Sequence, residues 1–131
     1  MFNIPFIDKI SDTFDNKYEN IKVGLTPKVQ LFSENKIKFY RYIPVKETLQ
    51  STPLLIIYAM INKNYILDLV PGTSFIEYLL SQGIDTYIID WGEPGDEDRF
   101  LELDYVIDRY IHKAVKKTLE VSGAEKLNMF G

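Results

Sequence analysis

The strongest hydrophobic signal in the chain is a short apolar run at residues 54–59, which follows Pro53 and gives way to the polar Asn62-Lys-Asn64. The run is rich in Leu and Ile and does not alternate with polar residues, so it predicts a strand buried on both faces. Strands of this kind belong to parallel sheets covered by helices. Ligands of open α/β sheets bind beyond the carboxyl ends of the strands. We therefore expect any functional site to include residues 59–68.

Two segments before this run have other periodicities. Residues 28–33 and 37–42 alternate apolar and polar side chains around a polar turn, which predicts an antiparallel hairpin at the edge of the sheet. Residues 1–23 instead carry apolar side chains at spacings of three and four, which predicts an amphipathic helix that begins after Pro5. This helix would pack either on its own domain or on a partner subunit. Its apolar positions are Phe6, Ile7, Ile10, Phe14, Tyr18 and Ile21.

The second half of the chain alternates helices with strands. Ser74 and Glu77 have the spacing of a capping box, and the helix they begin is expected to end at Gly83 in a left-handed conformation. Residues 85–91 predict a strand, residues 92–99 a polar loop, residues 103–121 a longer helix ended by Gly123, and residues 126–131 a last strand. The apolar stripe expected on the longer helix is Leu103, Ile107, Tyr110, Ile111, Ala114, Val115 and Leu119.

The order of hairpin, strand, helix, strand, helix and strand predicts the α/β class with right-handed crossovers. Nothing in this order covers the far side of Leu127 and Met129 on the last strand. We therefore interpret residues 24–131 as the front part of a larger α/β domain and residues 1–23 as a separate N-terminal helical segment. The other interpretation is a complete small three-layer protein.

Composition narrows the function classes. The 131 residues are 46% hydrophobic and 26% charged, which is typical of a globular domain, and the formal net charge of -4 argues against nucleic acid. The absence of cysteine excludes disulfides and thiolate metal sites. The longest apolar run is too short to cross a bilayer, and the N-terminus lacks the features of a signal peptide, so we expect a cytoplasmic protein without a transmembrane segment.

The end of the last predicted strand has a possible catalytic meaning. In α/β hydrolases a strand runs into a Gly-x-nucleophile-x-Gly elbow. Gly131 lies where the first glycine of such an elbow would be. One glycine after a strand is a weak signal, and it gains weight only from the sequence that precedes it.

That preceding sequence resembles the catalytic subunit of polyhydroxyalkanoate synthases of the two-subunit types called class III and class IV. The resemblance covers most of the chain from Val23 onward. It rests on several pieces in a fixed order, each of which would be weak alone. They are Gly24-Leu-Thr-Pro27, Phe39-Tyr-Arg-Tyr42, Leu55-Ile-Ile-Tyr-Ala-Met-Ile-Asn-Lys63, Tyr65-Ile-Leu-Asp-Leu69, Tyr87-Ile-Ile-Asp-Trp-Gly92 and Tyr105-Val-Ile-Asp-Arg-Tyr-Ile111.

The resemblance implies an acyltransferase on the N-terminal part of an α/β-hydrolase fold. Its substrate would be a 3-hydroxyacyl-CoA, with no other cofactor, and its partners would be a second synthase subunit and the polymer granule surface. In that family a cysteine nucleophile follows the position of Gly131, and an aspartate and a histidine come much later. No residue of the triad lies in this chain, so we expect the 131 residues alone to be inactive.

The part of the chemistry that this chain could supply is an oxyanion donor. In α/β hydrolases one donor is a backbone N–H in the loop after the third strand. That loop begins at Ala59, so the candidates are the backbone N–H groups of Met60 and Ile61. The alternative is that both residues extend the core strand.

Other polar residues near this loop have two interpretations each. Asn62, Tyr65 and Asp68 would form a polar wall of the substrate pocket or stabilise the loop, and Asp68 would do the latter by bonding backbone amides ahead of the Ser74 helix. Trp91 would line the pocket or anchor the packing. We expect His112, the only histidine, to lie on the solvated side of the long helix. The acidic Asp96-Glu-Asp98 lacks the ligand spacing of a calcium loop, so no metal site is expected.

Two rival functions remain open. One is another α/β hydrolase, a lipase or esterase with a serine at the elbow. The other is a short, non-catalytic protein that binds a partner subunit or the granule surface. The residue two positions after Gly131 distinguishes the first rival, because the synthase requires cysteine there.

Overall fold

The computed structural model describes residues 22–131. The predicted N-terminal helix falls on residues 1–21, outside the described residues. The described chain forms one five-stranded sheet with the strand order β1-β2-β4-β3-β5. The strands are β1 (Lys28–Glu34), β2 (Ile37–Tyr42), β3 (Leu54–Ile56), β4 (Thr86–Asp90) and β5 (Asn128–Phe130). The helices are η1 (Asn64–Leu67), α2 (Phe75–Ser81), η2 (Asp96–Phe100), α3 (Leu103–Tyr105), η3 (Val106–Ile111) and α4 (His112–Ser122).

The sheet combines an antiparallel edge with a parallel centre. β1 and β2 form an antiparallel hairpin, and β2 pairs antiparallel with β4, with Phe39 opposite Ile89. β3 pairs parallel with β4 on one side and with β5 on the other, with Leu55 between Tyr87 and Met129. The predicted edge hairpin and parallel sheet are therefore confirmed.

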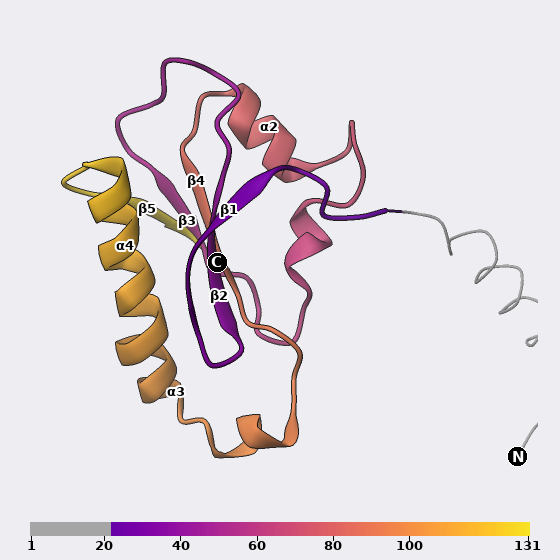
Figure 1. Cartoon of the computed structure of the whole chain (residues 1–131), viewed down its shortest axis with the longest axis vertical. Helices are drawn as coiled ribbons and strands as arrows, with labels where there is room; N and C mark the ends of the chain where they lie inside the picture. The colour runs from indigo at the N-terminus through magenta and orange to yellow at the C-terminus, as the bar shows by residue number, and fades with distance from the viewer. Residues whose placement is uncertain (1–21) are drawn as a thin grey trace, which may run out of the picture.

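Helices cover both faces of the sheet. The connection from β3 through α2 leads to β4, and the connection from β4 through α4 leads to β5 on the other side of β3. Right-handed crossovers that run in opposite directions along a sheet place their helices on opposite faces. Figure 1 shows α2 and α4 on opposite sides of the strands.

The core lies on both faces of the sheet, beneath the helices. Residues that face each other across neighbouring strands share a face of the sheet. Phe39, Tyr87 and Leu55 share one face and are all 0% exposed, and the Phe39 and Tyr87 rings stack with centroids 6.1 Å apart. Ile56 and Ile88 are opposite each other on the second face and are equally buried.

The first helix has the predicted ends, with one difference. The Ser74 hydroxyl accepts a hydrogen bond from the Glu77 N–H at 3.1 Å, and Gly83 has a φ of +72° after the last turn. The Glu77 carboxylate accepts from the Gly72 N–H at 2.9 Å. The predicted capping box is therefore formed from the serine side only, because the glutamate accepts from an amide two residues before Ser74 instead of from the Ser74 amide.

The longer helix corrects the predicted stripe. It begins at Leu103 as predicted, but Val106–Ile111 is a π-helical segment. A π-turn is wider than an α-turn and shifts the phase of the residues around it. Val106 and Tyr110 are therefore buried, whereas Leu103 and Ile107 remain 68% and 45% exposed. Gly123 ends the helix with a φ of +70°, as predicted.

Between residues 22 and 131, no helix has both the length and the apolar composition that a bilayer span needs.

Candidate functional site

The carboxyl ends of β3 and β5 lie side by side. The Ile57 N–H donates to the Phe130 carbonyl at 2.8 Å, which extends the pairing past the last residue of β3. Gly131 packs so closely on Ile57 that a Cβ added to it would lie 2.9 Å from the Ile57 carbonyl oxygen. This approach excludes a side chain at Gly131 without a shift of the backbone. The predicted elbow position and the loop after β3 are therefore neighbours in space.

The loop after β3 forms a tight turn at residues 59–62. The Asn62 N–H donates to the Ala59 carbonyl at 2.9 Å, so Met60 and Ile61 are the two central residues. A hydrogen bond of this kind uses only the first carbonyl and the last N–H of a turn. Among residues 22–131, neither the Met60 nor the Ile61 N–H has a backbone acceptor. Neither candidate donor is therefore used in the backbone pairing of the described residues.

The alternative that these residues extend the core strand is wrong. The ladder of β3 ends at Ile56, and the Ile61 side chain is 86% exposed. Met60 is half-buried and packs against the core. The predicted strand was too long because residues 57–59 are apolar or aromatic, although only Ile57 adds a further bond to β5 and residues 58 and 59 lie outside the pairing.

A small cavity lies at this turn. It has a volume of about 190 Å³, and its lining includes Met60, Ile61, Trp91 and Leu101. Trp91 is 3% exposed, and its indole Nε1–H donates to the Tyr58 carbonyl at 2.7 Å. Both interpretations of Trp91 therefore apply, because it anchors the packing and lines this cavity.

A larger open cavity, with a volume of about 560 Å³, lies beside the first. Tyr65 contributes to its wall together with Asn64, Lys38 and Asp90. This position agrees with a pocket-wall role for Tyr65. Asn62 is exposed and does not line either cavity, and its N–H closes the turn, so its observed role is loop structure.

Asp68 has a structural position. It is 3% exposed, and its carboxylate accepts from the Thr26 N–H at 3.0 Å, the Thr26 hydroxyl at 2.6 Å and the Ser74 hydroxyl at 2.6 Å. Its backbone carbonyl accepts from the Gly24 N–H at 2.7 Å. Asp68 thus joins the segment before β1 to the start of α2. The predicted bonding to backbone amides ahead of α2 is wrong, because at the start of this helix the carboxylate accepts from the Ser74 hydroxyl, and the Thr26 amide that it binds lies before β1.

His112 lies outside the site, whereas Asp98 lines the smaller cavity together with Lys36. His112 is exposed on α4 beside Lys113 and Lys116, as predicted for a surface residue. Asp98 forms an ion pair with Lys36 and accepts from the Gly95 N–H at 2.8 Å, and the hydrogen bond from Lys36 holds the Asp98 pKa below its ordinary value. Among residues 22–131, no group of three or more His, Asp or Glu side chains could hold a metal ion.

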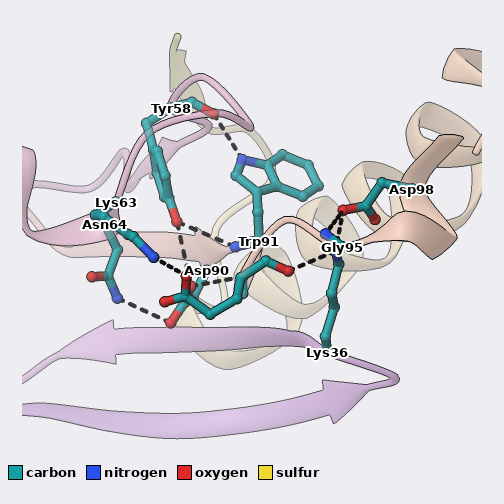
Figure 2. A network of polar contacts seen from close by, with 10 residues as sticks. Lys36, Tyr58, Lys63, Asn64, Asp90, Trp91, Gly95 and Asp98 are labelled. Atoms are coloured by element: carbon teal, nitrogen blue, oxygen red, sulfur yellow. Dashed lines mark hydrogen bonds and ion pairs between the residues drawn. The ribbon is translucent and has the colours of Figure 1, made fainter. Parts of the chain in front are cut away.

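Four residues at this edge of the sheet were not predicted from the sequence. Tyr58 and Asn64 flank the turn and bond to residues at the end of β4, and Lys36 and Lys63 bond to the loop that follows (Figure 2). Burial raises the pKa of the Tyr58 hydroxyl well above its ordinary value, so the hydroxyl stays protonated. Burial, the largest single effect, would lower the pKa of Lys36, but the hydrogen bonds and charges of Asp98 and Glu97 together outweigh it and the pKa is raised. The one sign of this arrangement in the sequence is Tyr58, which places a polar hydroxyl group within the apolar run at residues 54–59.

The fold and the site define an α/β protein with unpaired backbone amides at the carboxyl edge of its parallel strands. Residues 10–79 match a family model described as "Poly-beta-hydroxybutyrate polymerase (PhaC) N-terminus". The chain belongs to this family and corresponds to its N-terminal part, which confirms the resemblance found in the sequence.

Curated relatives carry the same name. The chain is 40% identical over 127 residues to the "Poly(3-hydroxyalkanoate) polymerase subunit PhaC" of Haloferax mediterranei, with 95% of this chain and 26% of the relative covered. It is 41% identical over 115 residues to the protein of that name from Allochromatium vinosum (86% and 32% covered), and 35% identical over 130 residues to that of Synechocystis (99% and 34% covered). The chain therefore spans about a quarter to a third of the length of these relatives.

Proposed function

We propose that this chain is the leading segment of a polyhydroxyalkanoate synthase of the α/β-hydrolase fold and supplies an oxyanion donor to its active site. In the whole enzyme a cysteine thiolate after Gly131 attacks the thioester carbonyl of a 3-hydroxyacyl-CoA, and the CoA thiolate leaves. The 3-hydroxyl group of one acyl unit then gives its proton to a general base and attacks the carbonyl of a second acyl thioester, whose C–S bond breaks and releases the thiolate, so that the growing chain lengthens by one ester bond. Each attack places negative charge on a carbonyl oxygen.

The observation that carries the proposal is the pairing of β5 with β3. It brings the elbow position at Gly131 next to the segment that leads into the turn of Met60 and Ile61. In α/β hydrolases the oxyanion donors are the N–H of the residue after the nucleophile and an N–H from the loop after the third strand. The unpaired amides of Met60 and Ile61 and the adjacent cavity agree with that requirement.

Proline substitution tests the donor, because proline has no N–H. In the whole polymerase that contains this segment, we expect Met60→Pro or Ile61→Pro to lower kcat for CoA release by about 10²–10³-fold, the usual effect of losing one oxyanion donor. Met60→Ala and Ile61→Ala retain the N–H and are the matched controls, with kcat within about threefold of wild type. Proline is compatible with the first central position of a type I turn and disfavoured at the second, so Met60→Pro is the cleaner variant. Full activity of both proline variants, with unchanged far-ultraviolet dichroism, would contradict the oxyanion role.

Two further measurements separate this function from its rivals. Purified residues 1–131 should release no CoA from 3-hydroxybutyryl-CoA, because the nucleophile is not among them. In the gene, a cysteine codon two positions after Gly131 supports the synthase, whereas a serine codon supports a lipase or esterase. Association with a second synthase subunit and with polymer granules belongs to the same proposal, and co-purification of the whole polymerase with each of them tests it.

A further inference from the structure

The turn that presents Met60 and Ile61 is attached at both ends to the same two residues, Asp90 at the end of β4 and Trp91 directly after it. Before the turn, the Tyr58 carbonyl accepts from the Trp91 indole Nε1–H at 2.7 Å, and the Tyr58 hydroxyl accepts from the Trp91 backbone N–H at 3.2 Å. After the turn, the Asn64 side-chain amide donates to the Asp90 carboxylate at 3.0 Å. Figure 2 shows these bonds converging on the Asp90–Trp91 step.

The Asp90 carboxylate also joins the two attachments. The Tyr58 hydroxyl donates to its Oδ1 atom in a long contact of 3.4 Å, and the Gly92 N–H donates to the same atom at 3.0 Å. Oδ2 accepts from Asn64. One carboxylate therefore holds the residue two before Met60, the residue three after Ile61 and the backbone beyond β4.

The attachment points themselves are firmly packed. Gly92 has a φ of +73°, and a Cβ added there would lie 2.8 Å from the Lys36 carbonyl oxygen at the hairpin tip. The Lys36 ammonium group donates to the Glu93 carbonyl at 2.9 Å. These contacts hold the end of β4 against the hairpin tip, so the end of β4 provides a fixed point for the turn.

Burial makes these bonds effective. Tyr58 is 8% exposed and Trp91 is 3% exposed, so water does not compete for their polar atoms. The Tyr58 hydroxyl stays protonated because burial raises its pKa, and it can therefore donate to Asp90 at any physiological pH. Both residues use their polar side-chain atoms in hydrogen bonds within the protein.

We infer that Tyr58, Asn64, Asp90 and Trp91 form a positioning clasp that holds the Met60 and Ile61 N–H groups where the oxyanion develops. The inference rests on the proposed function of that turn. We assign these four a positioning role, because the polar groups that form the clasp are bonded to one another within the protein. Displacement of an oxyanion donor by about 1 Å is expected to cost up to about 10²-fold in rate. The indole bond matters most, because it acts on the backbone directly before the turn.

The test uses the whole polymerase that contains this segment and measures CoA release from 3-hydroxybutyryl-CoA. Trp91→Phe keeps a buried ring but removes the Nε1–H donor, and we expect kcat to fall tenfold to a hundredfold while KM stays within twofold. Asn64→Ala removes the second attachment at a less buried position and should lower kcat by a smaller factor, again without a change in KM. Asn64→Ala keeps the test decisive if Trp91→Phe fails to fold.

Tyr87→Phe is the matched control. It removes an equally buried hydroxyl, bonded to the Asp85 carboxylate at 2.9 Å, at the opposite end of β4. Its kcat should stay within twofold, although its thermal midpoint falls as for the clasp variants. Wild-type kcat in Trp91→Phe or Asn64→Ala would overturn the clasp, and so would a loss of kcat in Tyr87→Phe that follows its thermal midpoint.

The two levels of the proposal fail separately. If Met60→Pro and Ile61→Pro are both fully active, the oxyanion role of the turn is wrong and the clasp fails with it. If either proline variant is inactive while Trp91→Phe and Asn64→Ala have wild-type kcat, only the clasp is wrong.

Discussion

Asp68→Ala should destabilise the contact between the segment before β1 and the start of α2. Asp68 is 3% exposed, and its carboxylate accepts from the Thr26 N–H, the Thr26 hydroxyl and the Ser74 hydroxyl. Alanine would leave these three donors without their acceptor. A hydrogen bond to a charged group contributes about 1.5–3 kcal/mol, but the three are not additive, and removing a buried carboxylate also removes its desolvation cost. If each of the three bonds contributes about 1 kcal/mol after these corrections, the net loss of local stability is about 3 kcal/mol.

Native-state hydrogen exchange of the whole polymerase measures this loss directly. A loss of about 3 kcal/mol corresponds to roughly hundredfold faster exchange in peptides that contain the Gly24 and Glu77 amides. Asp68→Asn keeps the shape and should show an intermediate effect, because the side-chain amide can accept from the Thr26 N–H and donate to the hydroxyls.

Asp96→Ala is the matched control for the removal of a carboxylate. The Asp96 side chain is 98% exposed and forms only an ion pair with Arg99, so exchange should stay within twofold of wild type. Unchanged protection of the Gly24 and Glu77 amides in Asp68→Ala would refute the reasoning. An equal effect of the two substitutions would refute it as well.

The remaining predictions concern stability. Gly83→Ala and Gly123→Ala both force alanine to a φ near +70°, but a Cβ at position 83 would also lie 3.2 Å from a backbone carbonyl oxygen, whereas position 123 is open. Gly123→Ala should cost about 1 kcal/mol and Gly83→Ala more, as read from thermal midpoints, and the reverse order would contradict the geometry. Hydrogen bonds from Lys113 and Arg109 hold the pKa of Glu34 below its ordinary value of 4.5, so the stabilisation is complete above that value and is lost as the pH falls through the lower folded-state pKa. The thermal midpoint should therefore fall more steeply below about pH 4.5 in wild type than in Glu34→Gln, and parallel curves would show that the contact contributes nothing.

The strand and helix order could be predicted because local patterns determine it. The apolar run ahead of Ala59, the Ser74 cap and the two helix-ending glycines at 83 and 123 each act through their nearest neighbours in the sequence. The π-helical segment could not be predicted in this way. Its extra residue has no local signature, and it is stabilised by tertiary contacts such as the bond from Asn35 to the Tyr110 hydroxyl at 3.0 Å.

The position of the candidate site could be predicted from the sequence, but the contacts between its residues could not. Sites in parallel sheets lie after the carboxyl ends of the strands, so the turn of Met60 and Ile61 after β3 could be predicted. The bonds from Trp91 to Tyr58 and from Asn64 to Asp90 join residues far apart in sequence, and single polar residues give no sign of their partners. Asp68 illustrates the same limit, because its bond to Thr26 depends on how the chain enters β1.

The strand order has a consequence for synthesis on the ribosome. The β1–β2 hairpin is complete early, but the neighbours of β3 on both sides come later in the chain, since Leu54 pairs with Thr86 on one side and with Asn128 on the other. β2 likewise waits for β4. Until β4 emerges, an apolar strand with two open edges is exposed to other nascent chains, which favours aggregation. Ribosome-bound chains halted before β4 should therefore be captured by chaperones far more than chains halted well beyond β5, and equal capture would show that β3 is protected by other means.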